Sequence, residues 1–328
     1  MRDDGWWPAM ELITAVSAWS DPGQRVYLGY LLSALLLALV VLGWRFRRQP
    51  GEFRRQICAC LSKDIWWHPS ARLDYLLFVL NPLWRVLPLF GGITFVPLMI
   101  RVSDSLYAGL GPVSPSWTAL EITASFTVAL FIADDFSRYV LHRMLHRVPA
   151  LWSLHRLHHS AEVMTPLTVY RLHPLESLLY TLRSVLTQGI VVGVYFYAFG
   201  IGITAWELAG VNVLTFVFNL AGANLRHSHV WIGYGPWLER LFISPAQHQI
   251  HHSLDRQHHD RNFGSFLAIW DGLFGSLTLS AGERVTGFGL ASGNPHRTLL
   301  DAWREPLVGM WRALSAVFSI NTTKNDLH

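Results

Sequence analysis

The chain has 328 residues, of which 51% are hydrophobic and only 15% are charged, against roughly 25% charged residues in ordinary soluble domains. This composition excludes intrinsic disorder, which requires low hydrophobicity, and indicates a chain built largely for a lipid environment. The net charge of +4 gives no case for nucleic acid as a partner. The two cysteines, Cys58 and Cys60, are too few for a disulfide framework, and their spacing does not match a zinc ribbon.

The first predicted membrane span is residues 26–44. These 19 residues carry no charge, and a helix of that length crosses a hydrocarbon core of about 30 Å. Arginines follow immediately, at positions 45, 47, 48, 54 and 55. A secretory signal would place its positive charge before the apolar run, so we expect a retained span. The positive-inside rule then predicts that the C-terminal end of the span faces the cytoplasm.

Three further apolar stretches follow in chain order. Residues 75–100 are interrupted by prolines and polar side chains, which predicts a kinked start followed by a span, and residues 117–133 are another candidate. Residues 184–225 contain one charge, Glu207, and are broken near the middle by Gly200 and Gly202, which predicts two consecutive spans. Since such a hairpin leaves and returns, the segments before and after it must share one compartment.

The predicted fold is therefore all-α, with about four to five transmembrane helices. We expect an N-terminal transmembrane region at 1–133, a second domain at 134–280 that includes the hairpin at about 178–225, and a C-terminal cytoplasmic tail at 281–328. The expected location is a bacterial inner membrane.

Histidine is the unusual feature of the composition, with 13 of its 16 residues between positions 142 and 259. One His-x-x-x-His pair and two His-x-x-His-His motifs provide eight of them: His142, His146, His155, His158, His159, His248, His251 and His252. Residues three and four apart share a helix face, so each motif can direct several imidazoles to one point. Eight imidazoles exceed the ligands of one ion and suit two, and imidazole favours iron, zinc, copper or nickel.

The order of these motifs resembles the fatty acid hydroxylase and sterol desaturase superfamily of membrane di-iron oxygenases. Further stretches that resemble it are Asp134-Asp135-Phe136, Pro149-Ala-Leu-Trp152, Arg171-Leu-His173-Pro174-Leu-Glu176, Asn262-Phe263-Gly264 and Trp270-Asp271-Gly-Leu-Phe274-Gly275. The resemblance covers about residues 134–275, which makes 134–280 the expected catalytic domain. It implies a cytoplasmic helical cap that holds two irons, with the eight motif histidines as ligands. The same histidines would also bind zinc in purified protein.

The resemblance also implies one ligand from the end of the last span, for which His227 and His229 compete; we favour His227. Three residues are candidates for either a direct or a supporting role at the metal: His173, His259 and Asp271. Metal-bound imidazoles commonly give their second N–H to a carboxylate or a carbonyl, which is a role open to Asp271.

The predicted function is O₂-dependent hydroxylation or desaturation of a membrane lipid such as a sterol, a fatty acyl chain or an ether lipid. The sequence has no dinucleotide-binding fingerprint, so electrons are expected from a separate ferredoxin or b-type cytochrome with its reductase. The alternative is a histidine-rich metal-binding or transport protein without oxygenase activity, which would place ligands inside the spans. A bis-histidine haem protein would do so as well, and it ranks last.

Overall fold

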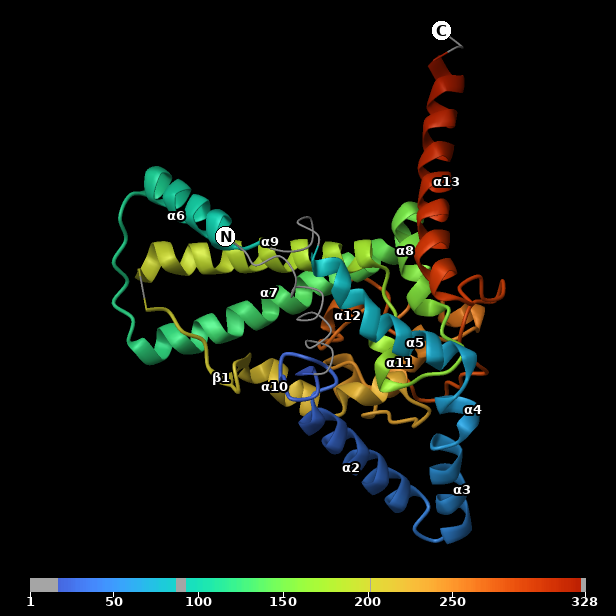
Figure 1. Ribbon diagram of the computed structural model, residues 1–328. Helices are drawn as coiled ribbons and strands as arrows, with labels where there is room; N and C mark the ends of the chain where they lie inside the picture. The colour runs from blue at the N-terminus through green and yellow to red at the C-terminus, as the bar shows by residue number, and fades with distance from the viewer. Residues whose placement is uncertain (1–16, 87–92, 201, 326–328) are drawn as a thin grey trace, which may run out of the picture.

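The computed structural model describes residues 17–86, 93–200 and 202–325, and the chain is mostly helical over these ranges (Figure 1). The mainly helical fold predicted from the sequence is confirmed. Part of the predicted span at 75–100 lies outside the described residues.

The described residues of the N-terminal part, from position 17 to position 86, contain four helices and a 3₁₀ turn. These are α2 (Leu28–Arg45), α3 (Pro50–Cys60), α4 (Lys63–Trp66), α5 (Pro69–Leu80) and η1 (Asn81–Val86). Helix α2 buries a stripe of Tyr30, Ala34, Ala38 and Leu42 at helical spacing, whereas many of its leucines are exposed. An apolar helix with an apolar exposed face is typical of contact with lipid.

Three long helices lie alongside one another and extend away from the end of the molecule that contains α8 and α11 (Figure 1). They are α6 (Val96–Leu110), α7 (Ala119–Arg147) and α9 (Pro174–Phe199). Helices α6 and α9 approach closely at Gly189 and Gly193. A Cβ at Gly193 would lie 2.8 Å from the carbonyl oxygen of Met99, and a Cβ at Gly189 would lie 2.7 Å from Leu98. Glycine at these two positions therefore permits the packing.

The predicted hairpin after position 184 differs from the structure in its second half. Helix α9 ends at Phe199, and Gly200 follows with a positive φ of 74°. Strands β1 (Glu207–Leu208) and β2 (Val211–Asn212) then form an antiparallel pair, and α10 (Val213–Leu220) has only 8 residues. Both loop residues, Ala209 and Gly210, have positive φ, as a tight two-residue hairpin turn requires.

The remaining elements surround the histidine motifs. They are α8 (Pro149–His159), η2 (Pro166–Tyr170), η3 (Ala223–His227), η4 (Leu238–Arg240), α11 (Pro245–His251), η5 (Arg256–His258), α12 (Ile269–Leu273) and α13 (Leu299–Asn325). Helix α13 lies in the region predicted as a tail, and it packs against α8.

Two of the described helices, α2 and α9, are long and apolar enough to cross a membrane. Helix α7 covers residues 119–133 of the predicted span at 117–133, but it is not one of these two helices. It continues without a break through the first histidine pair and ends at Arg147, so this pair lies in the last turns of the same helix.

Candidate metal centre

Nine histidines form two buried groups, and within each group the ligand nitrogens lie within 4.8 Å of one another. The first group is His142, His146, His155, His159 and His251, and the second is His158, His227, His248 and His252. All nine residues expected as metal ligands are in one group or the other. The groups are adjacent, since the rings of His159 and His252 stack with centroids 4.4 Å apart.

The helical spacing explains how each His-x-x-His-His motif serves both groups. In α8, the i,i+4 pair His155 and His159 enters the first group, whereas His158 enters the second. In α11 and its C-cap residue His252, the i,i+4 pair His248 and His252 enters the second group, whereas His251 enters the first. Adjacent helical residues point about 100° apart, so the doubled histidine of each motif divides between two neighbouring sites.

The nitrogens inside the groups have the properties that a metal ion requires. Nε2 of His146, His159 and His251 is buried without a hydrogen-bond partner. Burial lowers the pKa of His142 to about 4 and that of His158 to about 3. The rings are therefore neutral near pH 7, which is the protonation state that binds a metal. Buried, unpartnered lone pairs that converge in this way fit a metal ion.

Several imidazoles of the two groups are oriented by a hydrogen bond at Nδ1. Nδ1 of His155 lies 2.6 Å from Oε1 of Glu176, which is fully buried in the first turn of α9. Nδ1 of His142 and of His251 donate to the carbonyl oxygens of Phe263 and Arg261, at 2.8 and 2.7 Å. Such contacts fix the ring orientation and leave Nε2 free to bind. Sequence reasoning assigned no role to Glu176, although it lies in one of the matching motifs.

The loop that supplies these carbonyls is held by two buried carboxylates. Asp271 accepts from the backbone N–H of Phe263 and of Gly264, each at 2.8 Å. Asp135 on α7 accepts from the backbone of Phe266 and Leu267 and from Nε1 of Trp270. Asp271 belongs to neither histidine group and acts on the site through the loop.

The three remaining candidate histidines lie outside both groups. Nδ1 of His173 accepts from the backbone N–H of Leu175 and caps α9, and its Nε2 donates to the carbonyl oxygen of Trp303. Nε2 of His229 accepts from the backbone N–H of Met164 at 3.1 Å. Of the two competing positions after α10, the structure therefore brings His227 to the group and leaves His229 outside. His259 is exposed and lies outside both groups.

A family model described as fatty acid hydroxylase matches residues 127–276, a range that contains both histidine groups. The chain thus carries a fatty acid hydroxylase domain. This confirms the resemblance inferred from the motifs.

Several curated proteins are similar to this chain. Alkylglycerol monooxygenase from Homo sapiens is 29% identical over 48% of this chain and 32% of its own length. Ornithine lipid hydroxylase from Rhizobium tropici is 29% identical over 47% of this chain and 42% of its own length. A Delta(7)-sterol 5(6)-desaturase from Gibberella zeae is 23% identical over 75% of this chain and 64% of its own length.

The chain spans about a third of the length of the alkylglycerol monooxygenases that it matches. No solved structure matches it.

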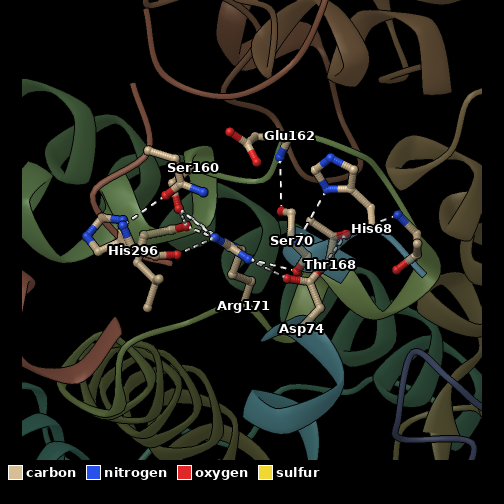
Figure 2. A network of polar contacts seen from close by, with 11 residues as sticks. His68, Ser70, Asp74, Ser160, Glu162, Thr168, Arg171 and His296 are labelled. Atoms are coloured by element: carbon tan, nitrogen blue, oxygen red, sulfur yellow. Dashed lines mark hydrogen bonds and ion pairs between the residues drawn. The ribbon is translucent and has the colours of Figure 1, made fainter. Parts of the chain in front are cut away.

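A buried network around Arg171 fixes the C-terminal end of α8 within the hydroxylase domain. Figure 2 shows its guanidinium between Asp74 and Ser70 on one side and Ser160 and His296 on the other. Arg171 is fully buried; its Nη1 lies 2.8 Å from Oδ1 of Asp74, and its Nε donates to the carbonyl oxygen of Leu157. The network thus joins α5 to the helix end that carries His158 and His159.

A cavity of about 780 Å³ reaches both histidine groups of the hydroxylase domain. Histidines at positions 142, 155, 158, 227 and 248 line one part of it. Apolar side chains from α5 and α9, such as Phe78 and Leu178, line another part. A cavity of this size and character can take the apolar part of a lipid.

Proposed function

We propose that this protein is an integral-membrane, O₂-dependent oxidoreductase of lipids whose two histidine groups hold two iron ions. The observation that carries the proposal is the division of nine buried imidazoles into two adjacent groups inside a fatty acid hydroxylase domain. The similar proteins act on an alkylglycerol, an ornithine lipid or a sterol by name, which supports a lipid substrate here.

The chain's own residues prepare the site in three ways. Nine neutral imidazoles supply the nitrogen ligands, and Glu176 and two backbone carbonyls hold three of the rings in position. The burial of the groups keeps bulk water from the reacting carbon. When bound, the iron pair would activate O₂, the oxidant that an unreactive lipid C–H bond requires.

Helices α7 and α9 support a proposal for how the substrate reaches the site from the bilayer. Both run into the site, and the cavity is lined partly by residues of α9, so a lipid can enter from the side while its reactive carbon reaches the histidines. We propose that the site faces the cytoplasm, from the positive-inside rule applied to the sequence. Electrons would come from a separate ferredoxin or b-type cytochrome.

The transport alternative receives less support. Helices α2 and α9 are long enough to cross a membrane, and neither contains a histidine. A path for a metal ion would need ligands along such helices.

Metal analysis of the detergent-purified protein, expressed with ample iron, tests the proposal. We expect about two irons per chain, with large losses in His155→Ala, from the first group, and in His252→Ala, from the second. His229→Ala is the matched control, and it should keep the parent's iron content. Substoichiometric metal that is unchanged in all three variants would refute the di-iron assignment. With iron confirmed, lipid oxidation under O₂ with a reducing partner is the next assay.

A further inference from the structure

The charged side chains that line the cavity are all positive. Four arginines line it, and among the residues that the structure describes no aspartate or glutamate does. Two of the four share one carboxylate outside the lining, because Arg138 and Arg183 lie 2.7 and 2.8 Å from the carboxylate of Asp134. The other two, Arg25 and Arg226, require a separate account.

Neither Arg25 nor Arg226 forms an ion pair with a described carboxylate. Arg226 is only 6% exposed; its Nε has no hydrogen-bond partner, and its Nη2 reaches only the carbonyl oxygen of Ile243, at 3.4 Å. The Nε of Arg25 is also buried without a partner, and its Nη2 lies 3.4 Å from the side-chain oxygen of Asn224. Arg226 is buried and Arg25 is half-buried. Guanidinium groups withdrawn from water without a counter-charge are costly, so this part of the cavity favours an anionic ligand.

The acidic side chain whose charge acts on Arg226 is Asp135, but its oxygens are already used. They accept from two backbone N–H groups and from the indole of Trp270, all within 3.0 Å. Asp135 therefore holds the loop after α11 and does not form an ion pair with Arg226.

The two arginines belong to one region of the cavity. Nδ2 of Asn224 donates to the carbonyl oxygen of Arg25 at 2.8 Å, and Asn224 lies two residues before Arg226 in η3. Burial, and then the positive charge of Arg226, lower the pKa of Arg25 to about 9, which leaves it charged at neutral pH. The charges of both arginines also act on His227, so this region adjoins the second histidine group.

We propose that the cavity binds an amphiphile whose polar end carries a negative charge, a phosphate or a carboxylate, and that Arg25 and Arg226 hold this charge. The fork of donors on guanidinium matches the oxygens of either group. The apolar chain would lie along Leu77 and Phe78 of α5 and Leu178 of α9, which line the same cavity. This inference names the substrate class of the proposed oxidoreductase and rests on that function.

Binding to the full-length, metal-loaded protein in non-ionic detergent tests the proposal. The probes are oleyl phosphate, oleyl alcohol and inorganic phosphate, which separate the charge from the chain. We expect the parent to bind oleyl phosphate about tenfold or more tightly than oleyl alcohol, the effect of one or more charge-assisted hydrogen bonds. In Arg25→Gln and in Arg226→Gln this preference should fall to near unity. The exposed Arg54 on α3 provides the matched control, Arg54→Gln, which should keep the full preference.

Three results would overturn the proposal. Equal affinity of the parent for oleyl phosphate and oleyl alcohol would show that the charge is not recognised. Inorganic phosphate that binds as tightly as oleyl phosphate would assign the arginines to a free anion and not to a lipid. A full preference retained in both glutamine variants would place the charge elsewhere.

Arg226→Lys is a control that separates loss of the charge from misfolding. It keeps the charge and should retain part of the preference, with thermal unfolding recorded for every protein. The iron content of the same samples is read separately, so a failure of the di-iron assignment is distinguishable from a failure of charge recognition.

Discussion

Removal of the carboxylate of Asp74 isolates the contribution of the Arg171 network to the site. Both side chains of this ion pair are 0% exposed, and Nη1 and Oδ1 lie 2.8 Å apart. Asp74→Ala leaves Arg171 with its bonds to Leu157, Ser160 and Ser70 but without a counter-charge. A buried charge that loses its partner is the costly case, whereas removal of both charges is often tolerated.

The expected cost is about 3–5 kcal/mol of folding free energy. Unfolding entropy of about 2.1 cal/mol/K per residue gives about 0.7 kcal/mol/K for a chain of 328 residues. The apparent Tm should therefore fall by about 4–7 °C. Because Arg171 contacts the end of α8, where His158 and His159 lie, we also expect reduced metal content.

The assay is thermal unfolding of the detergent-purified variants, followed by metal analysis. The control is Asp104→Ala, since Asp104 is exposed on α6 and its loss should shift Tm by about 1 °C or less. Asp74→Leu combined with Arg171→Met should recover part of the loss, though not all, because the oxygens that Arg171 contacts then lose a donor. An Asp74→Ala protein as stable as the Asp104→Ala control would refute the reasoning.

Three further predictions concern the residues around the histidine groups. Glu176→Gln replaces the carboxylate behind His155 and should weaken metal affinity about 10- to 100-fold in chelator competition, whereas unchanged affinity would show that the contact does not tune the ligand. Asp271→Asn weakens the hydrogen bonds to the loop whose carbonyl oxygen orients His142. Metal loss and proteolytic cleavage of that loop should both increase, and equal cleavage of parent and variant would contradict this. His173→Ala removes the cap of α9 and should lower Tm by about 1 °C or more, while the metal content stays at the parent's level. A loss of bound metal in this variant would instead indicate a ligand role.

Much of the site was predictable because its motifs are local. The i,i+4 spacing of His142 and His146, and of His155 and His159, places each pair on one helix face whatever the rest of the chain does. Composition likewise predicted a mainly helical, apolar chain and the long helix α2. The hairpin was less predictable, since the apolar run after Gly200 contains the turn at Ala209 and Gly210, whose positive φ values shorten the following helix to α10.

The sequence by itself determined which histidines can act together within one helix, because the helical period orients side chains of the same segment. Only the tertiary structure decided which segments meet. It brought His227 and not His229 to the second group, and it placed Glu176 beside Nδ1 of His155 from 21 residues away. It also left Arg25 and Arg226 together without a carboxylate, although 201 positions separate them in the sequence. Contacts of this kind depend on how helices pack, and no local spacing in the chain encodes them.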